Sequence, residues 1–255
     1  MSTTTKTVKV YTGTKFPKNV KAPRKRSNGL YIIGDSTNIP KLTAIEPVRG
    51  LKEKTQTNRY IRKGPFKNMP MFVMTLEERE TCHGPKGERL PCFAHCYGNN
   101  MPFAVRFNHK SNGFLDVLEH DIDLLAKRNV NGFSVRLHEL GDFYSLEYVA
   151  FWERMLIKHN SLHVFGYTHK TGPIGDAIEK LYHDFFGRFV IRNSDDSMRK
   201  ELRLSPYWTA KGSKRPSANY EGSGIVCPQQ TGKSNSCADC GLCMNLKTNI
   251  AFIGH

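Results

Sequence analysis

The hydrophobic pattern changes character near residue 70. From there on, short apolar runs alternate with longer segments in which apolar residues recur every three or four positions, the spacing of a helix that buries one face. The short runs predict strands at Met71–Leu76, Phe133–Leu137, Val164–Tyr167, Phe189–Ile191, Gly224–Cys227 and Ile250–Ile253. The periodic segments predict helices at Phe114–Lys127, Leu146–His159 and Ile174–Phe186, with a short helix near Ser197–Leu204.

The first two of these helices carry further local signals. In the first, an apolar stripe predicts the buried face, and three acidic residues are expected to turn away from it: Glu119, Asp121 and Asp123. Ser145 stands just before the second helix, where a serine hydroxyl can accept a backbone hydrogen bond as an N-cap. We therefore expect both segments to pack against a sheet through one face.

Repeated strand–helix–strand units of this length predict an α/β protein with a parallel sheet and right-handed crossovers. A partial or full β/α barrel fits best, and a doubly wound sheet is the alternative. We assign residues 70–255 to this β/α domain. Residues 1–69 are punctuated by proline and glycine, and we expect them to form a basic N-terminal extension with short strands at Val8–Tyr11 and Leu30–Ile33.

Positive charge is concentrated in this N-terminal part. Residues 1–67 contain sixteen lysines and arginines but only three acidic residues. This surplus of positive charge accounts for most of the formal net charge of +15. Aromatic residues that could stack on unpaired bases are interleaved with the basic ones: Tyr11, Phe16, Tyr31 and Tyr60. DNA or RNA is therefore the predicted partner of residues 1–67, and a solvated basic arm is the alternative.

Seven cysteines fall into two groups, and the second group has the more specific spacing. Cys227, Cys237, Cys240 and Cys243 form a C-x9-C-x2-C-x2-C pattern, with Pro228 after the first cysteine. Three cysteines at three-residue intervals suit three corners of an iron–sulfur cubane, whereas zinc sites are usually built from two separated C-x2-C pairs. We predict a 4Fe-4S cluster here, with zinc as the alternative.

The first group consists of Cys82, Cys92 and Cys96. Three thiolates can hold a cubane that leaves one iron open, as a catalytic centre requires. His83 or His95 could close the site instead, and with His95 the result would be a three-cysteine, one-histidine zinc site. Both cysteine groups could also join around fewer metals. The N-terminus has no apolar run typical of a signal peptide, and no stretch is long enough to span a bilayer. A cytoplasmic location, without a membrane partner, is the expectation, and there clustered cysteines more often bind metal than form disulfides.

Polar side chains follow successive strands, and the strand ends of a parallel β/α fold build its active site. We expect four of them to act in proton transfer and anion binding: His138, Asp142, His169 and Arg192. Tyr167, Asn193 and Cys227 should converge on the same mouth. The alternative is structural, with a core histidine, a helix-capping aspartate and a buried ion pair. The chain has no motif of a nucleotide phosphate cradle, a zincin or a serine hydrolase.

Four motifs resemble the phage Gene Product 88 domain family over about residues 70–255. They are CFAHCYGNN at 92–100, VRLHELGDFYSLEYVAFW at 135–152, FGYTHKT at 165–171 and CPQQTGKSNSCADCGLC at 227–243. A looser similarity is to radical S-adenosylmethionine enzymes, which place three cysteines after the first strand of a partial β/α barrel. Their C-x3-C-x2-C spacing fits Cys92 and Cys96, but Asn99 occupies the third position, so Cys82 would have to replace that ligand.

The Gene Product 88 resemblance by itself implies little function. The split of the cysteines into three and four, together with the strand-end residues, leads to the hypothesis of a phage-type iron–sulfur protein on a radical-enzyme-like scaffold that acts on nucleic acid or a nucleotide. S-adenosylmethionine would be its second cofactor, and the side chains expected to contact a cofactor are Tyr97, Asn99, Tyr167 and Asn193. The alternative is a non-enzymatic nucleic-acid-binding or host-interaction protein with structural metal sites. The sequence indicates no particular substrate, reaction or oligomeric state.

Overall fold

The computed structural model describes residues 20–35, 60–84, 87–88, 105–194, 207–208, 225–229, 231–234, 236–245 and 249–253. Its helices are α1 (Glu78–Thr81), α2 (Phe114–Arg128), α3 (Leu146–Lys158), α4 (Gly172–Asp184) and α5 (Cys237–Cys240), and the 3-10 turn η4 (Leu242–Met244) follows α5. The three long helices match the periodic segments. Ser145 is the N-cap of α3, and its hydroxyl accepts a hydrogen bond from the Tyr148 backbone N–H.

The main sheet has five strands in the order β2-β3-β5-β6-β7. They are β2 (Gly34–Asp35), β3 (Met71–Val73), β5 (Phe133–Leu137), β6 (Leu162–Thr168) and β7 (Phe189–Asn193). All adjacent pairs are parallel except β2 with β3. Two smaller sheets pair β1 (Val20–Lys21) with β4 (Arg106–Phe107), and β10 (Ile250–Ile253) with both β8 (Tyr207–Trp208) and β9 (Ile225–Val226).

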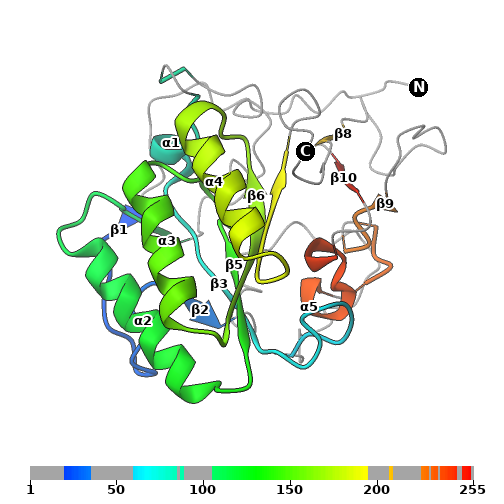
Figure 1. The fold of residues 1–255 in the computed structure, drawn as a ribbon, viewed down its shortest axis with the longest axis horizontal. Helices are drawn as coiled ribbons and strands as arrows, with labels where there is room; N and C mark the ends of the chain where they lie inside the picture. Colours follow the sequence, from blue (N-terminus) through cyan, green and yellow to red (C-terminus); the bar gives the residue numbers. More distant parts are fainter. Residues whose placement is uncertain are drawn as a thin grey trace, which may run out of the picture.

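The α/β class with parallel strands is confirmed. Strands β3, β5, β6 and β7 follow chain order, and α2, α3 and α4 lie together on one side of the sheet, with α5 on the other (Figure 1). A doubly wound sheet would instead carry crossover helices on both faces. Within the described residues, the late strands β9 and β10 pair in a separate small sheet, so the expectation that Cys227 ends a strand of the main sheet is wrong.

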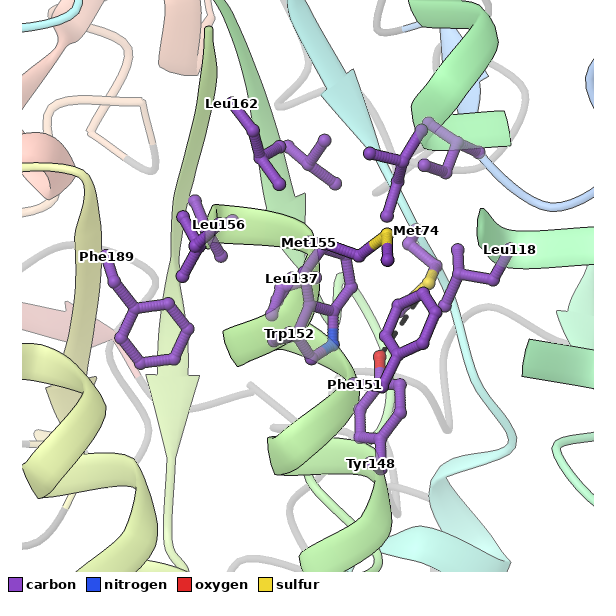
Figure 2. Packing of buried hydrophobic residues seen from close by; sticks show 14 of the residues in the cluster. Met74, Leu118, Leu137, Tyr148, Phe151, Trp152, Met155, Leu156, Leu162 and Phe189 are labelled. Carbon is purple, nitrogen blue, oxygen red and sulfur yellow. Dashed lines mark hydrogen bonds between the residues drawn. The ribbon is translucent and has the colours of Figure 1, made fainter. Parts of the chain in front are cut away.

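The larger core fills the space between the main sheet and α2–α4. Figure 2 shows Trp152 and Met155 of α3 beside Leu137 of β5, while the Tyr148 hydroxyl points toward Met74. All five are buried. Because burying one large apolar side chain stabilises a fold by about 1.5–3 kcal/mol, this interface is a main source of the domain's stability.

A second, smaller cluster covers the opposite face of the sheet. It joins sheet residues to the loop at 61–69 and to the C-terminal cysteine segment through these buried side chains: Ile61, Phe66, Met71, Phe165, Val190, Ala238 and Met244. Successive side chains of a strand point to opposite faces. In β6, every second residue counted from Phe165 therefore faces the cysteine segment and not the helices. The same holds for every second residue of β7 counted from Val190.

The described parts of the N-terminal region belong to the same body. Leu30, Ile32 and Ile33 are buried in the larger core, and Gly34–Asp35 forms the edge strand β2. The expected strand at Leu30–Ile33 is wrong, because these residues form a bend whose backbone N–H groups pair with a side chain. The expected strand at Val8–Tyr11 and the expected helix near Ser197–Leu204 lie outside the described residues.

That side chain is Asp121 of α2, and its predicted orientation is also wrong. The carboxylate is fully buried and accepts hydrogen bonds from the backbone N–H groups of Tyr31, Ile32 and Ile33 at 2.7, 2.7 and 2.9 Å. Burial raises the pKa of this carboxyl, and the three N–H donors oppose that rise. An acidic residue on the buried side of α2 thus takes the place of a strand partner for residues 31–33.

None of the described helices combines the length and the apolar character that a bilayer-spanning segment requires.

Candidate metal centre

Three polar side chains form a row across the second face of the main sheet. Arg136, Tyr167 and Arg192 come from the adjacent strands β5, β6 and β7, and Tyr167 lies directly opposite Arg192 in the parallel register. Each is out of phase with the apolar residues that face the helices, such as Leu137 and Ile191. The row therefore faces the segment that contains α5 and η4.

The cysteine segment docks on this face through close backbone contacts. Ser236 caps α5 by accepting a hydrogen bond from the Asp239 N–H, and the Arg62 N–H donates to the Ala238 carbonyl at 2.9 Å. Gly241, which ends α5 with a φ of +66°, lies against Lys63: a Cβ there would be 2.2 Å from the Lys63 carbonyl oxygen. Only glycine fits both this backbone conformation and this approach.

Side chains of the row contact two of the cysteines directly. The Tyr167 hydroxyl donates a hydrogen bond to Cys243 Sγ at 2.7 Å, and Arg136 Nη1 donates to Cys237 Sγ at 3.6 Å. Arg136 Nη1 also pairs with Glu139 at 2.5 Å. Arg192 is buried and donates to the carbonyl oxygens of Cys243, at 2.9 Å, and of Asn245. The sheet thus holds both the sulfurs and the backbone of the segment.

The electrostatic environment of these thiols is mixed. Burial raises the pKa of the Cys237 thiol to about 12, and the charge of Arg136 opposes this rise. Burial also raises the pKa of Cys243, while the Tyr167 hydrogen bond, Arg136 and Arg192 lower it and the nearby Cys227 raises it. Cys240 contributes to the rise at Cys237. The four cysteines of the second group are thus close neighbours, and nearby cations favour the thiolate form of Cys237 and Cys243.

This donor set fits a thiolate-bound metal group. Thiolate is the form that ligates metal, and hydrogen bonds and charges around the ligands are its usual second layer. Among the described residues, no group of three or more histidine, cysteine or carboxylate side chains is arranged around a single ion. The cysteines of an iron–sulfur cluster bind different irons, so they need not converge on one point as the ligands of a single ion must.

Cys82, from the first cysteine group, lies directly after α1 at the carboxyl end of the main sheet. Its backbone N–H donates to the Glu78 carbonyl. The buried Lys170 ammonium donates to the carbonyl oxygens on either side of it, those of Thr81 at 2.7 Å and His83 at 2.6 Å. Lys170 follows Tyr167 by three residues, so β6 and the residues just after it contact Cys243 and the backbone on either side of Cys82.

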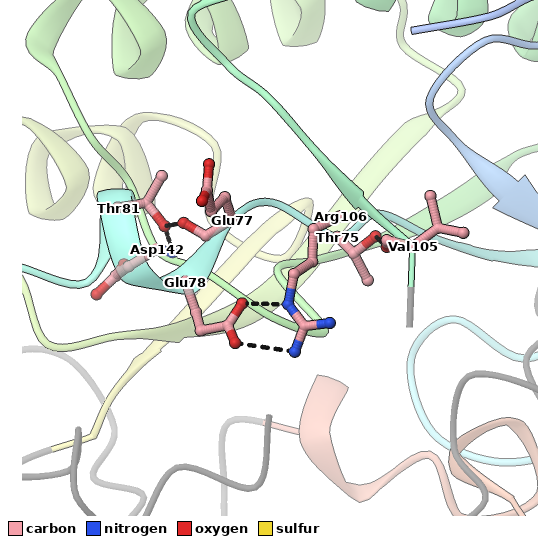
Figure 3. A network of polar contacts seen from close by, with 7 residues as sticks. All are labelled: Thr75, Glu77, Glu78, Thr81, Val105, Arg106 and Asp142. Atoms are coloured by element: carbon pink, nitrogen blue, oxygen red, sulfur yellow. Dashed lines mark hydrogen bonds and ion pairs between the residues drawn. The ribbon is translucent and has the colours of Figure 1, made fainter. Parts of the chain in front are cut away.

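A buried ion pair anchors α1 and therefore Cys82. Arg106 of β4 donates two hydrogen bonds to the Glu78 carboxylate, at 2.6 and 2.9 Å, as Figure 3 shows. Both side chains are at most 3% exposed. Such two-pronged arginine–carboxylate pairs fix orientation as well as distance. Thr81 adds a link to the loop after β5, because its hydroxyl accepts a hydrogen bond from the Asp142 N–H at 3.2 Å.

His138 and Asp142 lie on the helix side of the sheet in a packed network. The Asp142 carboxylate accepts hydrogen bonds from the Thr168 hydroxyl at 2.8 Å and from the His169 backbone N–H at 2.9 Å. His138 Nε2 lies 3.1 Å from the Tyr148 hydroxyl, and its backbone has a φ of +56°. Burial and the charge of Lys170 lower the pKa of His138 to about 3, so it is neutral near pH 7.

The expected strand-end residues therefore form two groups, not one mouth. Asp142 contacts the His169 backbone and Thr81, the neighbour of Cys82, and His138 contacts Tyr148. Tyr167 and Arg192 instead contact Cys243 on the other face. Asn193 is buried at the end of β7. Their proposed catalytic and cofactor roles stay predictions. Four expected site residues lie outside the described residues: Cys92, Cys96, Tyr97 and Asn99.

Arg136 and Lys170 make several of these contacts, but the sequence did not predict them as site residues. Arg136 alternates with Val135 and Leu137 in β5, so its parity marks it as a residue of the second face. Lys170 follows a strand like the other polar strand-end residues, but nothing local shows that its ammonium reaches the carbonyl groups beside Cys82.

Fold and site together define a class: an α/β protein whose parallel sheet carries helices on one face and a docked four-cysteine segment on the other. The chain belongs to the Gene product 88 family, whose model matches residues 45–246. This match confirms the phage family that the motifs indicated, and it begins well before residue 70. Comparisons with curated proteins and with solved structures find no match.

Proposed function

We propose that this protein is an iron–sulfur protein whose C-terminal cysteines hold a cluster against the second face of the main sheet. Its ligands are Cys227, Cys237, Cys240 and Cys243. The observation that carries the proposal is the pair of hydrogen bonds from Tyr167 to Cys243 and from Arg136 to Cys237. When bound, the cluster supplies one-electron chemistry.

The environment of these cysteines supports a ligand role over simple packing. A thiol that only fills space is stable without a cation, whereas a thiolate in a partly buried site needs donors and positive charge. Arg136 and Arg192 both lower the pKa of Cys243. Because burial raises the pKa of Cys237 and Cys243, we expect cluster binding to release protons.

Anaerobic purification followed by iron and acid-labile sulfide analysis tests this proposal. We expect iron and sulfide in equal amounts, and a lower content of both in Cys240→Ser. Ser234→Ala, a change in the same segment that removes no predicted ligand, is the matched control and should keep the wild-type content. A colourless protein with stoichiometric zinc would contradict the proposal.

A second cluster with one open iron is our proposal for Cys82, Cys92 and Cys96, and S-adenosylmethionine would bind there. Its support is the place of Cys82 after the first parallel strand, together with the Lys170 hydrogen bonds that fix the backbone on both sides. The reaction would act on nucleic acid or a nucleotide. Formation of 5′-deoxyadenosine by the reduced protein, and its loss in Cys82→Ala, is the test. Absence of that product from an iron-loaded wild-type protein would refute it.

The second candidate function is nucleic-acid binding with a structural metal site. Lys63 and Lys67 are exposed on the loop that contacts Gly241, so positive charge borders the cysteine segment. Replacing both by glutamate should weaken binding to a single-stranded oligonucleotide and reduce its salt dependence. Lys127→Glu, at the exposed end of α2, is the matched control. Equal binding by all three proteins would exclude this loop as the interface.

A further inference from the structure

We propose that Tyr167 raises the reduction potential of the cluster held by the C-terminal cysteines. This inference rests on the proposed iron–sulfur function. Tyr167 acts through Cys243 and not on a substrate, so it is a positioning residue. The proposed step is the transfer of one electron from an external one-electron donor to the cluster, without a bond being broken.

The geometry of the contact is specific. The Tyr167 hydroxyl lies 2.7 Å from Cys243 Sγ and donates its proton toward the sulfur. Tyr167 is near the end of β6, which has a hydrogen-bonded strand on each side, so its backbone is held in place. Cys243 is held independently, because Arg192 donates to its carbonyl oxygen at 2.9 Å. Donor and sulfur are therefore both fixed by contacts other than the one between them.

The direction of this hydrogen bond follows from the chemistry of its partners. A phenol hydroxyl donates its hydrogen, and the Cys243 sulfur accepts it. The phenol is thus a dipole whose positive end points at a ligand atom.

A dipole in this orientation stabilises the reduced cluster more than the oxidised one. Reduction adds one negative charge, part of which resides on the ligating sulfurs, and hydrogen bonds to those sulfurs are among the features that set cluster potentials. The low local dielectric strengthens the interaction relative to water. Removing the hydroxyl should therefore lower the reduction potential.

The test is a dye-mediated redox titration of Tyr167→Phe, which keeps the ring and removes only the hydroxyl. Tyr148→Phe is the matched control: it removes a buried phenol hydroxyl that lies on the helix face of the sheet. At a fixed potential we expect Tyr167→Phe to show about a tenfold lower ratio of reduced to oxidised cluster, which equals a downward shift of about 59 mV for a one-electron couple. Tyr148→Phe should titrate like the wild type.

The outcomes separate this inference from the function on which it rests. A wild-type chain without iron and sulfide overturns both. Equal iron content with equal potentials in wild type and Tyr167→Phe overturns the inference and leaves the proposed function intact. Loss of the cluster from Tyr167→Phe also overturns it, because the hydroxyl would then be needed for assembly and not for tuning. An equal shift in Tyr148→Phe would assign the effect to general loosening and would overturn it as well.

Discussion

Substitution of Gly241 by alanine should release the cysteine segment from the sheet. Gly241 has a φ of +66°, and a Cβ at this position would lie 2.2 Å from the Lys63 carbonyl oxygen and 2.8 Å from its carbonyl carbon. The left-handed backbone alone costs a residue with a Cβ about 1–2 kcal/mol. Displacing backbone atoms adds about 1–3 kcal/mol, the typical magnitude for overpacking.

Gly187 provides a matched control for the backbone contribution. It also has a positive φ, +82°, but a Cβ there would meet nothing within 4 Å. Gly187→Ala should therefore lower the free energy of unfolding by about 1–2 kcal/mol, and Gly241→Ala by about 2–5 kcal/mol. The difference between the variants isolates the contact with Lys63.

Two assays distinguish local undocking from global unfolding. Urea denaturation gives the free energy of unfolding, and mass spectrometry gives the native-state alkylation rate of Cys237 and Cys243 in metal-free protein. We expect faster alkylation in Gly241→Ala and an unchanged rate in Gly187→Ala. Equal alkylation rates in the two variants would refute the docking that the backbone contacts imply.

Three further predictions concern the core that supports the site. Asp121→Ala should lower the free energy of unfolding by about 3 kcal/mol or more, because it leaves several buried N–H donors without an acceptor; Asp123→Ala, with its partly exposed partners, should lower it by at most about 1 kcal/mol in the same urea assay. Glu78→Gln should lower it by about 3–5 kcal/mol, because a buried arginine loses its partner, whereas Glu80→Gln at an exposed pair should lower it by at most about 1 kcal/mol. Neutral His138 contributes stability that is present above its unfolded pKa of about 6.5 and is lost as the pH falls toward about 3, so the stability difference between wild type and His138→Asn should shrink over that range.

Each of these has a clear contradictory result. Equal losses in Asp121→Ala and Asp123→Ala would mean that the three backbone donors find other acceptors. Equal losses of unfolding free energy in Glu78→Gln and Glu80→Gln would show that the Arg106–Glu78 ion pair is hydrated. A stability difference for His138→Asn that stays constant with pH would show that the histidine is not held neutral.

The long elements could be predicted because their pattern is local. Helices α2, α3 and α4 and strand β5 each show an apolar period that a single segment can satisfy, and Ser145 caps α3 as expected. The bend at 31–33 could not be predicted in the same way. Its backbone donors are satisfied by Asp121, about ninety residues further along the chain.

The candidate site likewise has features that could be predicted from the local sequence and others that could not. Cysteine spacing indicated a ligand set, and Cys237 and Cys243 do lie together with shared neighbours. Arg192 was expected in an open mouth, but its parity in β7 places it on the face that the cysteine segment covers. The alternation of faces along β7 could be predicted from the sequence. The segment that covers the second face could not be predicted, because its docking depends on Gly64 and Gly241, which are almost 180 residues apart.

Iron and acid-labile sulfide content of the anaerobically purified protein tests the central claim most directly. The claim predicts a coloured wild-type protein with equal iron and sulfide, and Cys243→Ala with at least one cluster's share of both missing. Wild-type protein that contains zinc and no sulfide would contradict it, as would a Cys243→Ala variant with the full wild-type iron content.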